Sequence, residues 1–385
     1  MKKIKLTSYF FRTKWFVILV IAIVLIMFGR TVDSPALTKT AIVLGCGIDY
    51  SKEQSEFIVT TQSINMASSS MESSGQTTYE TYTCNGKTIS SALDDISRKM
   101  GLTMSLSHCN VLFVSDSALE LDILQLIHPL TKMYALPEHA VVVTADRSPK
   151  DMLALQIGTT ISSPYYLQLA LTNKEGTDAM IRTTIKDLMA RTLSRSKATA
   201  IPYVTATLMT DQPADSTTRY EERYELDLKQ ALVFNKTATH ILDKKPSEVL
   251  ALYISQSAYG AVNYVFEDGG TVDFSILEKS VETKAKGRNI EATIDLTVEL
   301  LDVQFIETDK VLTGADEIIL RAAENLGKEL SERLTELFEL SKELNIDFLG
   351  LQAKAYQSVG RHLEEDCLKT LSFQPTVKLT VKETS

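Results

Sequence analysis

The sequence predicts an α+β protein, in which an N-terminal membrane helix precedes two or three mixed α/β domains with largely antiparallel, small sheets. Three observations lead to this prediction. The chain has 385 residues, which is more than one compact core usually holds. Short apolar or alternating segments, typical of strands, are interleaved with segments whose apolar residues recur every three or four positions, as in helices. The run from Trp15 to Phe28 contains no polar side chain.

The composition excludes several classes of protein. Apolar residues make up 44% of the chain and charged residues 23%, so a disordered, collagen-like or polytopic membrane protein is excluded. Four cysteines are too few for a disulfide scaffold or a zinc cluster. The net charge is −9, but residues 1–30 carry six basic residues and no acidic one, so the remaining residues carry −15. Such an acidic body makes nucleic acid an unlikely partner and is not attracted to anionic lipids.

Residues 1–36 are predicted to be a membrane anchor or signal segment with a linker. The fourteen apolar residues from Trp15 to Phe28 span roughly 21 Å as a helix, against roughly 30 Å for the hydrocarbon core. Phe10 and Phe11 extend the segment, and Arg12 and Lys14 can snorkel to the surface. The preceding basic residues place the N-terminus in the cytoplasm and the body outside it.

Two readings of this segment stay open: a retained single-pass anchor, which we favour, and a cleaved signal peptide. The apolar core also fits the length of a signal peptide, and residues 33–36 form a loose cleavage site. A lipid anchor needs a cysteine directly after the apolar run, and the first cysteine is Cys46.

Residues 37–199 are predicted to form an α/β domain that closes at the polar run 194–199. We expect the second strand to pair antiparallel with the first, residues 65–78 to form a surface loop, and Pro129 to stop or kink its helix. The predicted strands are 41–48, 56–64, 79–83, 111–114 and 140–144, and the predicted helices are 88–100, 121–133, 149–157 and 177–195.

Residues 200–385 are predicted to form an α+β domain, which can also be divided near residue 275. The strongest helix pattern is 316–344, after a capping-box pattern at Thr313 and Asp316. A hairpin is expected around Asn235 and Lys236, and the last strand is expected at a sheet edge. The predicted strands are 201–208, 224–234, 237–242, 262–266, 271–275, 279–285, 290–304 and 376–382, and the other helices are 247–256 and 348–371.

Two glycine motifs resemble nucleotide-binding loops but lack a required glycine. Gly86-Lys87-Thr88 resembles the end of a phosphate loop, yet the earlier glycine is replaced by Thr81. Gly45-Cys46-Gly47 begins like a dinucleotide fingerprint, yet Tyr50 occupies the third glycine position. We interpret the first motif as a polar turn that starts a helix, and the second as a buried strand with glycines for close packing.

The titratable residues form no recognisable catalytic or metal-binding pattern. His108 and Cys109 are adjacent, so on a strand they point to opposite faces and cannot pair directly. His362 is followed by the acidic group 364–366, which we interpret as a solvated helix face. Cys46 and Cys109 lie in apolar strands, where we expect inert thiols, with a disulfide between them as a hypothesis for an oxidising compartment. We therefore predict no enzyme and no catalytic, cofactor-binding or metal-binding residues.

The order of these segments resembles the Ger(x)C family, the C subunits of spore germinant receptors. The resemblance covers nearly the whole chain but departs from the family in two respects. The lipidated cysteine typical of the family is missing, and so are the tryptophans often found near its C-terminal element, since Trp15 is the sole tryptophan. The matching elements are Gly45–Asp49, Gly86–Leu93, Ser107–Val114, Ala231–Phe234 and Asp347–Leu351.

The resemblance implies a non-enzymatic, extracytoplasmic subunit at the spore inner membrane. It implies assembly with integral membrane subunits of a receptor that senses small nutrient germinants, and the anchor is then the apolar helix itself. Two rival hypotheses stay open. One is an extracytoplasmic enzyme that uses His108, Asp49 and the acidic group near His362, and the other is a secreted structural or adhesion module.

Overall fold

The computed structural model describes most of the chain that follows the predicted anchor. The contacts divide the chain into two units, Met1–Ala41 and Ile42–Ser385. In the first unit, only the helical residues 18–21 and the start of the first strand are described, so the predicted anchor lies otherwise outside the described residues. In the part of the chain that the structure describes, no helix is both long enough and apolar enough to cross a membrane. The described residues are 18–21, 40–64, 79–157, 161–172, 180–209, 224–255, 260–267, 269–304, 315–360 and 367–382.

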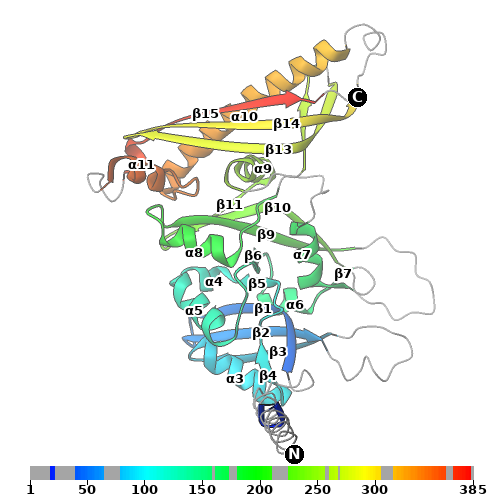
Figure 1. The fold of residues 1–385 in the computed structure, drawn as a ribbon, viewed down its shortest axis with the longest axis vertical. Coiled ribbons are helices and arrows are strands. Elements are labelled where there is room, and N and C mark those ends of the chain that lie inside the picture. Colours follow the sequence, from blue (N-terminus) through cyan, green and yellow to red (C-terminus); the bar gives the residue numbers. More distant parts are fainter. Residues whose placement is uncertain are drawn as a thin grey trace, which may run out of the picture. The chain divides into compact units, whose positions relative to one another are not determined.

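The first sheet has eleven strands, nine of which follow one another across it (Figure 1). In sequence order, the strands are β1 (Thr40–Ser51), β2 (Glu56–Ile64), β3 (Tyr79–Gly86), β4 (Thr103–Ser105), β5 (Val111–Val114), β6 (Val141–Ala145), β7 (Gln156–Ile157), β8 (Ile161–Ser162), β9 (Ala198–Leu208), β10 (Tyr224–Asn235) and β11 (Thr239–Leu242). Their order in the sheet is β3-β2-β1-β5-β6-β9-β10-β7-β8, with β4 paired to β1 and β11 to β10. The predicted antiparallel pairing of β1 with β2 is confirmed.

The prediction of small sheets was wrong for this sheet, which has eleven strands, whereas its pairings are largely antiparallel, as predicted. At its centre, however, three successive pairings are parallel: β1 with β5, β5 with β6, and β6 with β9. Parallel strands need helical crossovers, which cover both faces of the sheet. The helices that provide this cover are α3 (Ile89–Met100), α4 (Asp116–Leu119), α5 (Ile123–Met133), α6 (Pro149–Ala154), α7 (Ser163–Thr172) and α8 (Ile185–Leu193).

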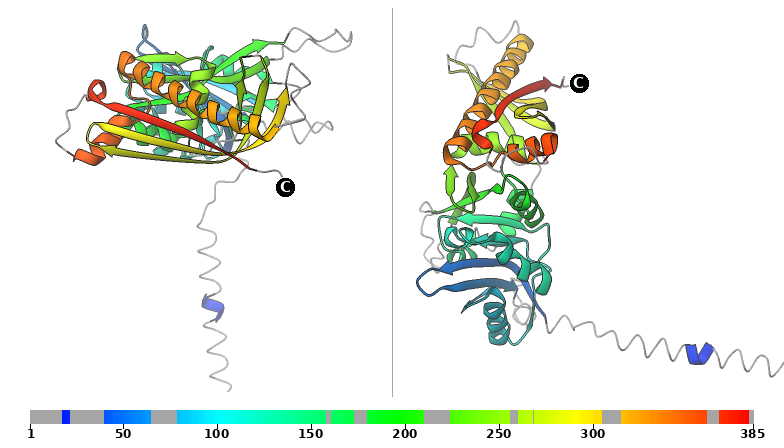
Figure 2. Two further views of the ribbon diagram at one scale, coloured as in Figure 1. Left: turned by 90° about the horizontal axis from the view of Figure 1, so that it is seen from above. Right: turned by 90° about the vertical axis from the view of Figure 1, so that its left-hand side faces the viewer.

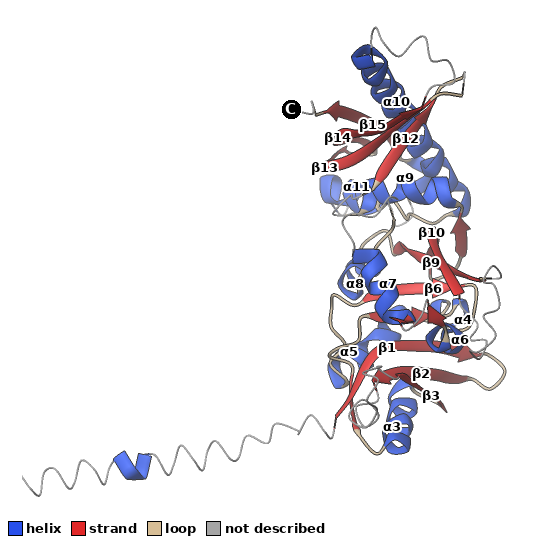
Figure 3. Cartoon of the chain, turned by 90° about the vertical axis from the view of Figure 1, so that its right-hand side faces the viewer, coloured by secondary structure: helices blue, strands red, loops and turns tan. Residues whose placement is uncertain are grey.

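Each face of the first sheet has its own buried cluster. Leu112 and Val114 of β5 belong to the cluster that contains the apolar residues of α3, α5 and α8. Val111 and Phe113, which alternate with them, belong to a second cluster with residues of α6 and α7. In Figure 1, α5 and α8 lie to the left of β5 and β6, and α6 and α7 lie to their right; Figure 3 shows the same helices in blue beside the red strands. The apolar run of β5 is therefore continuous because both faces of the strand are buried.

The second sheet has four strands, in the order β12-β13-β14-β15. These are β12 (Ala261–Val265), β13 (Thr271–Lys286), β14 (Asn289–Gln304) and β15 (Ser372–Val381), and the accompanying helices are α9 (Lys244–Ile254), α10 (Ala315–Leu344), α11 (Leu351–Val359) and the short 3-10 helix Leu368–Thr370. Strand β15 lies at the sheet edge, as predicted, and runs parallel to β14. Two predicted strands, 271–275 and 279–285, are one strand, β13, with a register shift between Ile276 and Glu278.

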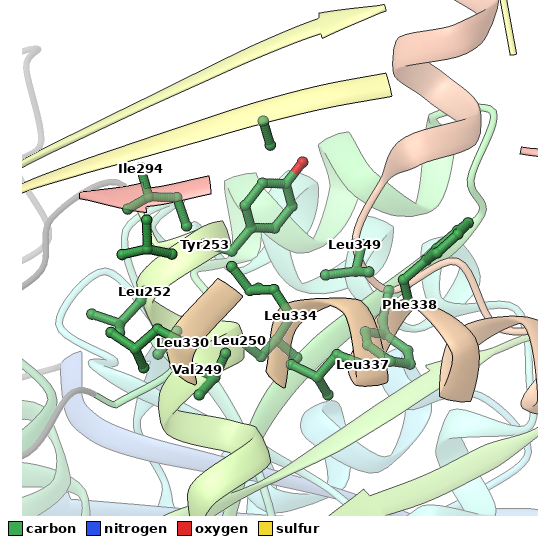
Figure 4. Packing of buried hydrophobic residues seen from close by; sticks show 14 of the residues in the cluster. Val249, Leu250, Leu252, Tyr253, Ile294, Leu330, Leu334, Leu337, Phe338 and Leu349 are labelled. Carbon is green, nitrogen blue, oxygen red and sulfur yellow. The ribbon is translucent and has the colours of Figure 1, made fainter. Parts of the chain in front are cut away.

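Helix α10 covers one face of the second sheet (Figure 2). Leu334 and Phe338 of α10 share a buried cluster with Tyr253 of α9 and Ile294 of β14 (Figure 4). The Ser331 hydroxyl of α10 accepts a hydrogen bond of 2.9 Å from the backbone N–H of Val377. This contact satisfies a backbone donor on the edge strand β15, which has no neighbouring strand on that side.

Two helices differ from their predicted bounds, and a third keeps its predicted end despite an internal proline. Helix α5 continues past Pro129 to Met133, so this proline does not end it. Helix α8 begins after the capping box of Thr184 with Asp187, and is much shorter than the predicted 177–195. Helix α11 follows Gly350 at φ 78° and stops before Gly360, so the predicted helix 348–371 was too long; residues 361–366 lie outside the described residues, and Leu368–Thr370 form a 3-10 helix.

Strands β9 and β10 connect the two sheets. They follow the expected domain boundary at residue 199, yet they are hydrogen-bonded into the first sheet. The predicted hairpin of β10 and β11 around Asn235 is confirmed, and its Oδ1 accepts the backbone N–H groups of Thr237 and Ala238. Ala231 and Val233 of β10 face the cluster of the second sheet, whereas Leu232 and Phe234 face that of the first.

Candidate functional site

The two glycines of β1 are packing positions, as predicted. A Cβ atom at Gly45 would lie 2.8 Å from Leu153 Cδ2, and one at Gly47 would lie 2.7 Å from Pro149 Cβ. Both atoms belong to α6, which therefore approaches the β1 backbone more closely than a larger residue allows. The motif is a helix-packing surface and not a phosphate-binding turn.

The predicted helix start at Gly86-Lys87-Thr88 is also confirmed. The Thr88 side chain accepts the backbone N–H of Ser91 at 3.1 Å, and the Ser91 hydroxyl accepts the N–H of Thr88 at 3.2 Å. This reciprocal pair is a capping box at the beginning of α3. A Cβ at Gly86 would lie 2.8 Å from the backbone nitrogen of Ala92, which explains why a glycine precedes the cap.

The structure does not bring Asp49 and His108 together. Asp49 follows Ile48, which pairs with Val114 at the end of β5, whereas His108 precedes β5, whose first residue pairs with Gly45. Four strand residues separate the two ends by about 13 Å. The Asp49 carboxylate instead accepts the hydroxyl of Ser117 at 2.9 Å, and His108 is exposed. His362 and the acidic residues 364–366 lie outside the described residues.

Both predicted inert thiols are buried and free. Burial raises the pKa of Cys46, with a smaller contribution from Cys109, and burial raises the pKa of Cys109 to about 12. The thiolate is the reactive form, so neither sulfur is a nucleophile near neutral pH. Among the described residues, no group of three histidines, cysteines or carboxylates is placed to hold a metal ion.

We call the part of the second unit built on the first sheet its N-terminal half, and the part built on the second sheet its C-terminal half. A cleft that the sequence did not reveal lies where these two halves meet. It has a volume of about 760 Å³ and is bounded by α8, the turn before β9, the C-terminal end of α9, β13 and the start of α11. Its charged lining residues are Arg191, Lys279 and Lys354, and none of the described lining residues is acidic. These residues are far apart in the sequence, so no motif could have indicated the cleft.

Lys279 closes one wall of this cleft by capping a helix. Its ammonium group donates to the carbonyl oxygens of Leu252 at 2.9 Å and of Ala251 and Ser255 at the end of α9. Burial lowers the pKa of Lys279 to about 8. All three of its donors are used, so Lys279 supplies positive charge without a free hydrogen bond.

Asp347 is the buried polar centre beneath the opposite wall. Its carboxylate accepts the backbone N–H groups of Leu351 at 2.9 Å and Gln352 at 2.7 Å, at the start of α11. The Ser196 hydroxyl, from the turn before β9, also bonds to it and accepts the N–H of Ala353 at 3.2 Å. Burial raises the pKa of Asp347 to about 6, although these hydrogen bonds oppose the shift. One serine thus joins the two halves.

Comparison with known proteins assigns both halves to one family. The family model described as the spore germination protein N-terminal domain matches residues 33–206, and the model described as spore germination B3/GerAC like, C-terminal, matches residues 229–385. The chain belongs to the GerAC-like family of spore germination proteins. The predicted resemblance to the C subunits of germinant receptors is confirmed. Membership gives the chain a role in spore germination, and the family implies association with other receptor subunits at a spore membrane.

The two family segments meet inside the first sheet. The N-terminal match ends in β9 and the C-terminal match begins in β10, and these two strands pair antiparallel along their length. The chain is also similar to a crystal structure of the GerBC protein, with 11% identity and a TM-score of 0.49, over 88% of this chain and 97% of that one. No curated protein matches the chain in a sequence comparison. The segment Asp347–Leu351, one of the elements on which the predicted resemblance rested, builds one wall of the cleft.

Proposed function

We propose that the chain is the membrane-tethered C subunit of a spore nutrient germinant receptor and acts by binding other receptor subunits, without catalysis. The observation that carries this proposal is the pair of family matches, in order, over residues 33–206 and 229–385. The body carries −15 beyond residue 30, so electrostatics gives it no attraction to anionic lipid. The apolar N-terminal segment is the part that holds it at the membrane, with the body outside the cytoplasm.

Tethering supplies the mechanism of assembly. A body held at a bilayer surface is confined near integral membrane partners, so binding to them becomes effectively intramolecular. A modest contact area then suffices for assembly. Deleting the anchor should therefore weaken assembly even if the folded body is unchanged.

The receptor role is tested by deleting the chain from the spore-forming host that produces it. We expect loss of germination in response to nutrients, restored by the wild-type chain, with an unchanged response to a trigger that bypasses nutrient receptors. Normal nutrient germination and normal amounts of the integral membrane subunits after deletion would contradict the proposal.

The anchor is tested separately by substitutions in the apolar run. Ile21→Lys with Val24→Lys places two charges in the segment, and each charge at a helix centre costs about 2.5 to 3.5 kcal/mol of insertion free energy. We expect the protein to leave the alkali-washed membrane fraction. Thr31→Lys with Ser34→Lys, in the predicted linker, is the matched control and should stay in the membrane. N-terminal sequencing of the membrane fraction distinguishes a retained anchor from a cleaved signal peptide.

A further inference from the structure

The cleft between the two halves differs in charge from the rest of the body. The chain beyond residue 30 carries −15, yet Arg191, Lys279 and Lys354 line the cleft and no described lining residue is acidic. The acids Glu138 and Asp187 line a neighbouring hollow of about 460 Å³, which shares Arg191, Ile254 and Ser255 with the cleft. Positive lining in an acidic protein concentrates small anions from solution.

Arg191 and Ser255 have hydrogen-bonding capacity that the described residues leave unused. Arg191 Nη2 donates to the carbonyl oxygen of Ile254 at 2.9 Å, which holds the guanidinium beside Ser255. Within the described part of the chain, Arg191 Nη1 and Ser255 Oγ are buried and have no hydrogen-bond partner. Buried polar atoms are nearly always paired, so two unpaired ones on residues that line the same cleft indicate a missing acceptor.

Two other positive features of the cleft are already occupied. The backbone N–H groups at the start of α11 are bonded to Asp347 and Ser196, and the Lys279 donors are bonded to the end of α9. The hydrogen-bond donors that remain free for an anion are therefore neither those of the helix terminus nor those of the buried lysine. The free groups belong to Arg191 and Ser255, and the exposed Lys354 adds a positive charge to the lining.

We propose that this cleft binds a small molecule with one carboxylate and no cationic group, held by Arg191 and Ser255. A guanidinium with a neighbouring hydroxyl matches the acceptors of a carboxylate. The volume of about 760 Å³ lies in the range of small-molecule sites. Within the cleft, a ligand ammonium group would find no carboxylate among the described lining residues, because Glu138 and Asp187 line the neighbouring hollow instead, so zwitterions are disfavoured. This proposal concerns the folded body and does not depend on the receptor role.

Three matched probes test the ligand class with the full chain in detergent. L-lactate has a carboxylate, L-alanine adds an ammonium group in place of the hydroxyl, and L-lactamide is neutral. Isothermal titration should show that lactate binds, that alanine binds at least tenfold more weakly, and that lactamide does not bind. Equal affinities for lactate and alanine, no lactate binding, or tighter binding of inorganic phosphate would overturn the proposal.

Matched variants test the location of the site. Arg191→Gln should weaken lactate binding at least tenfold, whereas Arg182→Gln, an exposed arginine in the neighbouring hollow, should leave it unchanged. Arg191 also donates a hydrogen bond to the carbonyl oxygen of Ile254, so its replacement can disturb the local structure. Lys354→Glu, at an exposed position, avoids this effect and should weaken lactate binding several-fold. Equal losses in Arg182→Gln and Arg191→Gln, or no loss in Lys354→Glu, would show that the cleft is not the site.

Discussion

The two sheets of this protein bury their strands in opposite ways. In the first sheet, all four residues of β5 are buried, because helices cover both faces. In the second sheet, β14 alternates between residues that face α10 and residues that face solvent. The difference shows that the pattern of apolar residues reports how many faces of a sheet are covered, as well as where a strand lies.

Close packing also differs between the sheets. Gly45 and Gly47 of β1 allow α6 to approach the strand, whereas Gly287 of the second sheet lies in the turn between β13 and β14 at φ 69°. The first sheet needs glycine for space, and the second needs it for backbone conformation.

The largest expected effect is the loss of unfolding free energy when a buried strand residue is truncated. Leu112→Ala and Phe113→Ala should each lower the free energy of unfolding by about 2 to 5 kcal/mol, because both side chains are buried, on opposite faces. In the second sheet, Ile294→Ala should cost a similar amount, whereas the exposed Asp295→Ala should change stability by less than about 0.5 kcal/mol. Chemical denaturation measures all four, and a small effect at either Leu112 or Phe113 would contradict two-sided burial.

The next effect depends on pH and tests the junction between the two regions. The pKa of Asp347 is raised from an ordinary 3.8 to about 6, so the native state binds this proton more tightly than the unfolded chain. This group therefore stabilises the fold most below pH 4, and its contribution is lost as the pH rises through 6, by up to about 3 kcal/mol. The unfolding free energy of wild type minus that of Asp347→Asn should fall between pH 4 and pH 7. Asp295→Asn, at an exposed position, is the control, and a difference that stays constant with pH would contradict the buried carboxylate.

The glycines give a smaller contrast. Gly45→Ala should destabilise by about 1 to 3 kcal/mol, because its Cβ would press on Leu153 and Pro164. Gly287→Ala should cost about 1 kcal/mol, since a Cβ there meets nothing within 4 Å and only the left-handed backbone opposes it. Adding Leu153→Ala should recover part of the loss at Gly45 and none at Gly287, as measured by thermal unfolding of the single and double variants.

The smallest predicted effect concerns the serine that links the halves. Ser196→Ala removes a donor to Asp347 and an acceptor for the N–H of Ala353, and should cost about 1 kcal/mol. Ser280→Ala, at an exposed position on β13, is the control. Hydrogen exchange should accelerate at the start of α11 only in Ser196→Ala, and unchanged exchange there would argue against the link.

Local signals predicted most elements but not their assembly. The apolar runs at Val111–Val114 and 140–144 identified β5 and β6, and Thr88 identified the start of α3. The same continuous runs indicated buried strands, but no local signal showed that these strands pair in parallel or fixed the order of eleven strands. The ends of α11 were missed because periodicity does not register the left-handed Gly350.

The candidate site was less accessible to sequence reasoning. Its family-like segment Asp347–Leu351 was recognised, but its burial against Ser196 depends on contacts across some 150 residues of sequence. Arg191 and Lys279 lie on different elements, and each resembles an ordinary solvent-exposed cation in the sequence. Only the fold turns them into a basic cleft.

The hairpin of β9 and β10 has a consequence for how the body responds to force. Successive residues of β10 belong to different cores: Ala231 and Val233 to one, Leu232 and Phe234 to the other. A force applied to the C-terminal half therefore acts on strands β9 and β10, which also belong to the sheet of the N-terminal half. We therefore expect the two halves to unfold in a single calorimetric transition and to rotate together as one rigid body.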